Sequence, residues 1–155
     1  MSSTTKPIPE YRQSVTPYLT IKNAGAAIEF YKRVFGAVEK MRLAEPDGKV
    51  GHAEIEIGTA RIMISDEYPE LDVLGPQSRG GATAGLHLLV EDVDAMFSVA
   101  VSAGANVLTP VTDEFYGERV GKLADPFGHV WYVGTLTENL SDEDIRRRYE
   151  DLMKQ

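Results

Sequence analysis

The chain contains no cysteine, which excludes disulfide bonds, thiolate catalysis and cysteine-ligated zinc or iron–sulfur centres. It also lacks any apolar run of about 18 residues, the length that a membrane-spanning helix needs. The polar start, MSSTTKPIPEYRQS, has no apolar core of the kind found in secretory signals. We therefore expect a cytoplasmic protein with no membrane partner.

Basic side chains are scarce as well, because 16 lysines and arginines stand against 24 aspartates and glutamates, for a formal net charge of −8. We expect no nucleic-acid partner, since binding nucleic acid requires a basic face that neutralises phosphates. The acidic balance would suit a cationic ligand. The apolar share of 43% and the length of 155 residues fit one domain or two small modules that share a core.

Residues 15–66 predict a module of the order βαβββ, preceded by a flexible N-terminus at residues 1–14. Apolar residues alternate along 15–22, and Asn23 is then the expected N-cap of a helix that ends at Gly36. The expected buried face of that helix is Ala27, Ile28, Tyr31, Val34 and Phe35. Further strands are predicted at 38–44, 49–57 and 60–65.

Residues 67–83 are rich in proline and glycine without a clear period, which predicts a linker loop. The βαβββ pattern then repeats over 84–136, with Asp92 as the expected helix N-cap. The expected helix face is Val93, Met96, Phe97, Ala100 and Val101, and strands are predicted at 84–90, 106–111, 117–124 and 129–135. Placing Ile21 on Val90 superposes the halves with an offset of roughly 69 residues, which indicates a duplicated module.

Residues 137–155 predict a C-terminal helix. Ser141 and Asp144 fit a capping pattern at its start, and Ile145, Tyr149 and Leu152 share one face. We expect that face to pack on the body of the protein or on a second subunit.

Three stretches resemble the vicinal oxygen chelate superfamily, also called the glyoxalase/bleomycin resistance/dioxygenase superfamily: VTPYLTIKNAGAAIEFYKRVFGA, GLHLLVEDVDAMFSVAVSAGA and ADPFGHVWYVGT. Its PhnB-like branch is resembled by GHAEIEIG, MISDE, EFYGERVGKLADPFGHVW and the SDEDIRRR tail. The resemblance implies an α+β fold in which two βαβββ modules form curled mixed sheets around a cavity. It also implies a homodimer.

In that superfamily a metal, when present, is held by His, Glu or Gln side chains from the first and last strands of both modules. The matching positions in this chain are Thr16, Met63, Gly85 and Tyr132. None of them is a carboxylate or an imidazole, and a thioether is a poor ligand for hard or borderline cations. We therefore expect no metal bound in the usual manner and no other cofactor.

Alternation along the strands indicates which side chains face the implied cavity. Tyr18 shares the face of Thr16, and His87 shares that of Gly85, where it would contact a ligand, act as a base or serve as a buried structural histidine. His52 and Glu54 lie two residues apart on one strand face, close enough to pair, either as a polar wall of the pocket or as a solvated surface.

Later residues add further candidates. Arg119 could bind a carboxylate or phosphate with two hydrogen bonds, or it could form a plain salt bridge with Glu118. Tyr132 is a better pocket candidate than Trp131, which points the other way and is expected in the core. Asp66 is interpreted as part of a polar turn.

The leading functional hypothesis is a metal-independent binding module for a small, partly aromatic or cationic molecule, as the resemblance to bleomycin-resistance proteins implies. The expected ligand-binding residues are Tyr18, His52, Glu54, His87, Tyr116, Arg119 and Tyr132. One alternative is a lyase, isomerase or dioxygenase with Zn, Ni, Mn or Fe displaced onto His52, Glu54 and His87. A second alternative is a structural protein whose cavity has closed.

Overall fold

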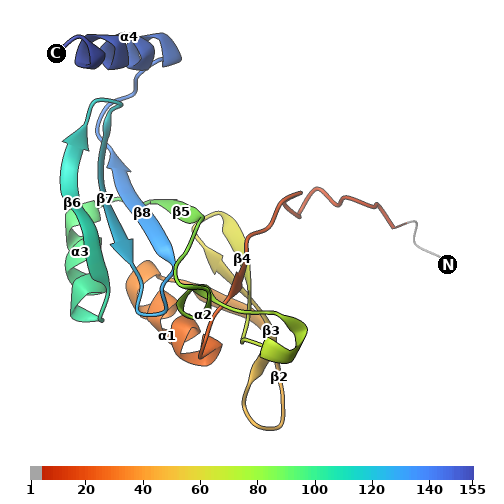
Figure 1. Ribbon diagram of the computed structural model, residues 1–155. Helices are drawn as coiled ribbons and strands as arrows, with labels where there is room; N and C mark the ends of the chain where they lie inside the picture. The colour runs from red at the N-terminus through yellow and green to blue at the C-terminus, as the bar shows by residue number, and fades with distance from the viewer. Residues whose placement is uncertain (1–4) are drawn as a thin grey trace. The chain divides into compact units, whose positions relative to one another are not determined.

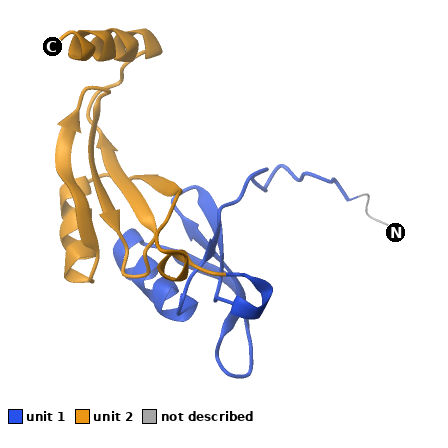
Figure 2. Ribbon diagram, in the orientation of Figure 1, with its two compact units in different colours: residues 1–73 blue, residues 74–155 orange. Residues whose placement is uncertain are grey.

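A computed structural model describes residues 5–155 of the chain (Figure 1). The chain divides between Val73 and Leu74 into two compact units, here called unit 1 and unit 2 (Figure 2). The division falls inside the segment predicted as a linker, residues 67–83. None of the helices within the described residues combines the length and apolarity needed to cross a bilayer.

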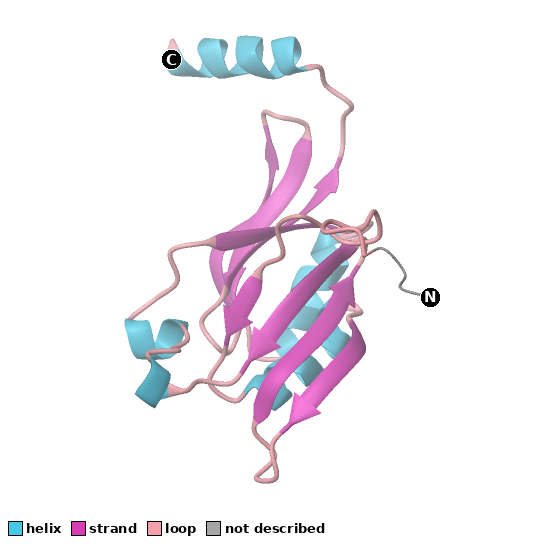
Figure 3. Cartoon of the chain, turned by 90° about the vertical axis from the view of Figure 1, so that its right-hand side faces the viewer, coloured by secondary structure: helices cyan, strands magenta, loops and turns pink. Residues whose placement is uncertain are grey.

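Unit 1 contains one four-stranded mixed sheet with a helix on one face (Figure 3). Its elements are β1 (Tyr18–Thr20), α1 (Ala24–Phe35), β2 (Val38–Ala44), β3 (Val50–Ile57), β4 (Ala60–Ser65) and the 3-10 turn η1 (Pro69–Leu71). The strand order is β1-β4-β3-β2, in which β1 runs parallel to β4 and the other neighbours are antiparallel.

Unit 2 repeats this plan. Its elements are α2 (Pro76–Arg79), β5 (Gly85–Leu89), α3 (Val93–Ser102), β6 (Asn106–Glu114), β7 (Glu118–Ala124), β8 (Val130–Leu136) and α4 (Asp142–Met153). The strand order is β5-β8-β7-β6, again with only the first pair parallel, and α3 lies along the sheet (Figure 1). The predicted α+β fold of two βαβββ modules with mixed sheets is confirmed.

The duplication extends to the register of the strands. Tyr18 pairs with Met63 in unit 1, and adding 69 to each number gives His87 and Tyr132, which pair in unit 2. A backbone hydrogen bond shows the same offset, because Ile21 N donates to Ser65 O and Val90 N donates to Gly134 O. The pairing of the first and last strands is therefore the same in the two units at the level of individual residues.

The start of α1 differs from the prediction. Asn23 does occupy the N-cap position, but its backbone is left-handed (φ 69°) and its side chain caps nothing. The buried carboxylate of Asp66 replaces it, since Oδ1 accepts from Ala24 N (2.9 Å) and Oδ2 accepts from Val50 N (2.7 Å). Asp66 thus fastens a helix and a strand together, and its interpretation as a simple polar turn was wrong.

In unit 2, different side chains accept hydrogen bonds from the backbone N–H groups at the start of the helix. Thr135, the counterpart of Asp66, accepts from Val93 N through Oγ1 (2.9 Å) and donates to Val90 O (2.9 Å). Asp92 caps α3 as predicted, because its carboxylate accepts from Ala95 N (3.0 Å).

The core of unit 1 is the predicted one, since every residue of the expected α1 face is buried against the sheet. In unit 2, Trp131 is buried as expected, and its Nε1 donates to Asp125 Oδ2 (3.0 Å). Val101 is a correction, because it lies near the end of α3 with 48% of its surface exposed. Its neighbour Ala100 is fully buried, so the buried strip of α3 is narrower than the predicted face.

Several boundaries also shift. The first strand covers Tyr18–Thr20 and not 15–22, and the segment 67–83 contains η1 and α2, each started by a proline, where only a loop was predicted. Strand β6 runs on to Glu114 although it contains Pro110, because an edge strand tolerates a missing N–H. Residues 5–17 form no helix or strand.

Helix α4 begins with the predicted capping box, in which Ser141 and Asp144 satisfy each other's backbone N–H groups. Arg148 ties it to the rest of unit 2, since its guanidinium bonds Glu138 at 2.6 and 3.1 Å and donates to Phe115 O (3.1 Å). The Tyr149 and Phe115 rings lie 5.8 Å apart. No residue of α4 is buried, so the apolar face predicted to pack is still largely open within this chain.

Candidate functional site

A chain of polar contacts runs across the face of the unit 1 sheet opposite α1. At one end, the Tyr18 hydroxyl on β1 lies 2.6 Å from Nδ1 of His52 on β3, with the two ring centroids 5.4 Å apart. Nε2 of the same imidazole lies 3.5 Å from Glu54 Oε1. The alternation of β3 therefore places His52 and Glu54 on one face and close enough to pair, as the sequence predicts.

Glu54 is the most deeply buried of these groups, with 4% of its surface exposed. A buried carboxylate is costly unless it is paired and hydrogen-bonded. Arg61 Nη1 donates to its Oε2 (3.0 Å), and Arg12 approaches Oε1 at 3.8 Å. The two oxygens of this buried carboxylate thus each face an arginine inside the polar face.

The chain ends at Glu56, which Arg61 Nη2 bonds at 2.8 Å and Lys40 approaches at 3.8 Å. The hydrogen bond from Arg61 lowers the pKa of the Glu56 carboxyl below its usual value, against a smaller opposing effect of desolvation. Glu56 therefore anchors the arginine on which Glu54 depends.

A groove of about 550 Å³ opens beside Tyr18 in the same unit. Its lining residues are Tyr18, Thr20, Glu45, Gly51, Ser65, Tyr68, Leu71 and Val73. Desolvation, followed by a hydrogen bond to Glu45 (2.9 Å) and nearby carboxylates, raises the pKa of Tyr68 to about 12. Lys49 Nζ lies 4.2 Å from the centre of the Tyr68 ring. The groove thus combines aromatic rings, an aliphatic end and negative charge.

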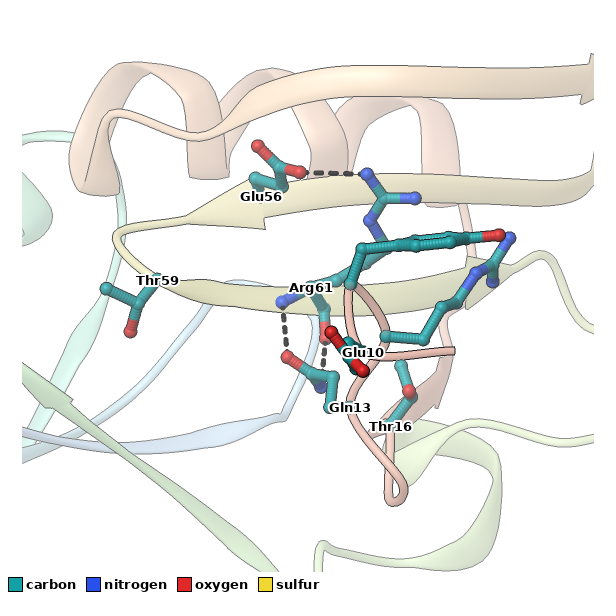
Figure 4. Close-up of a pocket in the computed structure, with 8 residues that line it drawn as sticks. Glu10, Gln13, Thr16, Glu56, Thr59 and Arg61 are labelled. Atoms are coloured by element: carbon teal, nitrogen blue, oxygen red, sulfur yellow. Dashed lines mark hydrogen bonds and ion pairs between the residues drawn. The ribbon is translucent and has the colours of Figure 1, made fainter. Parts of the chain in front are cut away.

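A smaller pocket of about 310 Å³ lies between the N-terminal segment and β4 (Figure 4). The Gln13 amide there bonds both backbone groups of Arg61, at 2.9 and 3.0 Å, much as a neighbouring strand would. The guanidinium of Arg61 is occupied by Glu54 and Glu56. Because its charges are already paired with one another, this pocket has less to offer a ligand than the groove beside Tyr18.

The equivalent face of unit 2 holds a different pair. His87 Nε2 lies 2.5 Å from Oε1 of Glu118, a buried carboxylate on β7. Gly134 on β8 lies between them, and a side chain there would overlap the Glu118 carboxylate. The contact therefore depends on the absence of a Cβ at residue 134.

Tyr132 lies over Gly85 in unit 2, so that a Cβ on Gly85 would come within 2.5 Å of the tyrosine ring. Lys122 Nζ lies 5.2 Å from the centre of that ring. Tyr132 is 39% exposed, in keeping with its predicted direction away from the core. Its ring occupies the space above one of the four positions at which the superfamily can hold a metal.

Tyr116 and Arg119 lie apart from the His87 pair. Tyr116 is in the β6–β7 turn, packed edge-on against Phe115, and desolvation followed by the nearby Glu114 and Glu118 raises its pKa. Arg119 forms two 2.9 Å hydrogen bonds to Asp94 on α3 and approaches Asp113 at 3.4 Å. Glu118 points to the opposite face of β7, so the expectation that it forms a salt bridge with Arg119 was wrong.

The four positions that correspond to superfamily metal ligands do not fit a divalent cation. Thr16, Met63, Gly85 and Tyr132 offer no carboxylate and no imidazole, and the Tyr132 ring covers Gly85. The alternative set divides, with His52 and Glu54 in unit 1 and His87 in unit 2. Within residues 5–155, no three His, Cys, Asp or Glu side chains are grouped so that they could hold a metal ion.

Of the eight residues that line the groove, only Tyr18 belongs to the expected ligand-binding set, and the other seven were missed. Tyr68 and Leu71 lie in the segment predicted as a featureless linker, yet Tyr68 N and O both bond Val73, which folds the segment over η1. Tyr-Pro at 68–69 followed by Asp72 is a turn signal that could have suggested this local fold. Nothing local to the sequence places the tyrosine beside Glu45.

Comparisons with known proteins agree with this architecture. The family model described as "Glyoxalase/Bleomycin resistance protein/Dioxygenase superfamily" matches residues 14–133. The uncharacterized protein Mb0911c of Mycobacterium bovis is 39% identical over 136 residues, which cover 86% of this chain and 90% of that protein.

Two solved structures extend the comparison. TioX from Micromonospora sp. ML1 is 25% identical, with a TM-score of 0.62 over 81% of this chain and 99% of that one. A PhnB protein from Bacillus cereus is 19% identical, with a TM-score of 0.63 over 79% and 99%. At the second identity the likeness concerns the fold alone.

Proposed function

The chain belongs to the glyoxalase/bleomycin resistance protein/dioxygenase superfamily, and from this premise we propose that it binds a small aromatic cation in the groove beside Tyr18. Binding does not require the metal that other members can hold between their first and last strands. The observation that carries this proposal is the groove itself, which has the size of a small-molecule site and lies on a sheet face lined with polar side chains.

The charge and ring content of the groove favour a cationic aromatic guest. Tyr18 supplies an aromatic ring to the groove, Leu71 and Val73 supply apolar surface, and Glu45 supplies a carboxylate that also accepts from the Tyr68 hydroxyl. A cationic guest would compete with Lys49 for the Tyr68 ring, since Nζ of that lysine lies 4.2 Å from the ring centre. An organic cation over a tyrosine ring is stabilised by about 0.5–2 kcal/mol. The net charge of −8 attracts such a guest at long range.

Benzyltrimethylammonium, benzyl alcohol and benzoate are suitable probes, because they share a ring and differ in charge. We expect saturable chemical-shift changes at the backbone amides of Tyr18, Gly51 and Tyr68 with the cation, weaker changes with the alcohol and none with benzoate. Tyr68→Leu should weaken the response, whereas Tyr149→Leu, on α4, should leave it unchanged. Equal responses to all three probes, or shifts confined to unit 2, would contradict the proposal.

The metal-dependent alternative predicts a different result. Protein purified without chelators should contain less than one equivalent of Zn, Ni, Mn or Fe by elemental analysis if binding is metal-independent. A stoichiometric metal that is lost in a His52→Ala/His87→Ala double variant would favour a lyase, isomerase or dioxygenase instead.

We further propose a cytoplasmic location and a homodimer. The absence of cysteine supports the first, since a reducing compartment makes no use of disulfides. The open apolar face of α4 supports the second. Light scattering coupled to gel filtration should give a mass near twice the 17.1 kDa chain, and a monomer would overturn the dimer.

A further inference from the structure

We propose that Tyr18 is a nucleophilic hydroxyl, with His52 as its general base and Glu54 as the residue that positions the base. The groove would then act chemically on small electrophiles that carry a leaving group, such as activated acyl or sulfonyl compounds. This inference goes beyond ligand binding and does not depend on the identity of any bound cation.

The first support is the distance between the hydroxyl and the imidazole. The Tyr18 oxygen lies 2.6 Å from His52 Nδ1, within the range in which a base removes a proton from a nucleophile. Half of the tyrosine surface is exposed and the residue lines the groove, so an electrophile can reach the oxygen.

The second support is the group on the far side of the imidazole. For Nδ1 to accept the Tyr18 proton, the neutral ring must carry its own proton on Nε2, which points toward Glu54 Oε1 at 3.5 Å. Once His52 gains the proton it becomes a cation, and Glu54 then lies at ion-pair distance. The arrangement has the logic of a nucleophile, a base and an orienting carboxylate.

The third support is the rigidity of the carboxylate. Glu54 is buried, is fixed by Arg61 at 3.0 Å, and stands opposite Met63 across β3 and β4, the same residue that pairs with Tyr18 across β1 and β4. The three groups therefore come from β1 and β3, which flank β4 in one sheet, so little reorganisation is needed when the proton moves.

The expected step is balanced without a redox partner. With a sulfonyl fluoride, the Tyr18 oxygen forms a bond to sulfur, the sulfur–fluorine bond breaks, fluoride leaves, and the phenolic proton passes to His52 Nδ1. An activated acyl compound would react in the same way, with its leaving group in place of fluoride.

Benzenesulfonyl fluoride provides the test, because it is neutral and needs no cation site. Tyr11 is the internal control, since it is more exposed than Tyr18 (86% against 51%), lies outside the α4 face proposed for the dimer, and has no histidine bonded to it in the described structure. Peptide mapping by mass spectrometry over time should show Tyr18 modified faster than Tyr11 by about tenfold or more, although Tyr11 is the more exposed of the two. Equal rates in the native protein would overturn the proposal.

Variants separate the roles of the base and the positioning residue. His52→Gln should reduce the rate at Tyr18 to that at Tyr11 or below, and Glu54→Gln should reduce it in part, with the rate at Tyr11 unchanged in both. Circular dichroism checks that each variant is folded. An unchanged rate in folded His52→Gln would refute the base. Fast labelling of Tyr18 together with no response to benzyltrimethylammonium would retain this inference and reject the binding proposal.

Discussion

Tyr18 and His87 occupy the same position in the first strands of unit 1 and unit 2, 69 residues apart, and each reaches across the last strand toward the third. Tyr18 meets an imidazole, His52, whereas His87 meets a carboxylate, Glu118. The backbone ladders of the two units match, yet the side chains differ at every polar position named here. The duplicated units therefore share the pairing of their first and last strands, but the polar side chains on their sheet faces differ.

The helix attachments show the same contrast with a clearer energetic meaning. Asp66 fastens α1 with a buried carboxylate that accepts two backbone N–H groups, while Thr135 fastens α3 with one hydroxyl. Hydrogen bonds to charged groups contribute about 1.5–3 kcal/mol each, against about 1 kcal/mol for neutral ones. The first unit therefore depends more strongly on this single residue than the second does.

The largest predicted effect follows from that asymmetry. Asp66→Ala leaves two donors without their partner and should lower the free energy of unfolding by about 3 kcal/mol. Thr135→Ala should cost only about 1 kcal/mol. Urea unfolding of both variants measures the difference, and equal losses would mean that the two attachments are energetically equivalent.

Gly134 offers the next largest effect, because its counterpart in unit 1 is Ser65, which carries a side chain at the same register. Gly134→Ala should displace the Glu118 carboxylate, separate it from His87 and cost about 2 kcal/mol through overpacking. Ser65→Ala is the matched control and should cost less than about 1 kcal/mol. Ring ¹⁵N shifts of His87 report the broken contact, and unaltered shifts in Gly134→Ala would contradict it.

A third prediction concerns alkaline pH and unit 1 alone, since the counterpart of Tyr68 in unit 2 is Thr137, which does not titrate. With a folded-state pKa of about 12, Tyr68 keeps its proton above its usual range. Its contribution to stability is present below about pH 10 and is lost as the pH rises through 12. In Glu45→Gln, NMR titration of the Tyr68 ring should show a lower pKa that still exceeds 10, because the effect of desolvation remains. An unchanged pKa would show that the Glu45 contact does not contribute to the shift.

The smallest effect is expected at Asp94, whose counterpart in unit 1 is Gly25. The hydrogen bonds from Arg119 lower the pKa of the Asp94 carboxyl, so the pair stabilises unit 2 above the ordinary aspartate pKa and is lost as the pH falls through the lowered one. Arg119→Met should return the pKa of Asp94 toward 3.8, with little change in the unfolding midpoint at neutral pH. NMR titration of the carboxyl group measures the pKa of Asp94. A large decrease in the unfolding midpoint of Arg119→Met would show that the pair is more than a surface contact.

Much of the fold was predictable because its signals are local. Helical spacing identified the buried face of α1, alternation separated Trp131 from Tyr132, and the repeated pattern gave the offset of 69 that the strand register confirms. The superfamily resemblance is confirmed by the match over residues 14–133. The prediction for Val101 was wrong because spacing does not define how wide the buried strip of a helix is.

The missed features are those that join distant residues. Asn23 is a residue type that caps helices, but its backbone is left-handed and its side chain does not cap α1. Asp66 caps the helix instead, by accepting a hydrogen bond from the N–H of Ala24, 42 residues away. Arg119 finds Asp94, 25 residues away, and not its neighbour Glu118. In the candidate site, alternation placed Tyr18 and His52 on one face, but their direct contact needs the order β1-β4-β3, which one sequence does not specify.

The tyrosine ring above Gly85 also constrains how this chain can change over generations. Any residue larger than glycine at 85 collides with Tyr132 as long as the ring is present. A larger residue at 85 therefore requires either that the partly exposed Tyr132 ring turns away or that a smaller residue stands at 132. Residues 85 and 132 should therefore depend on each other, so that Gly85→Ala is tolerated better beside a smaller residue at 132.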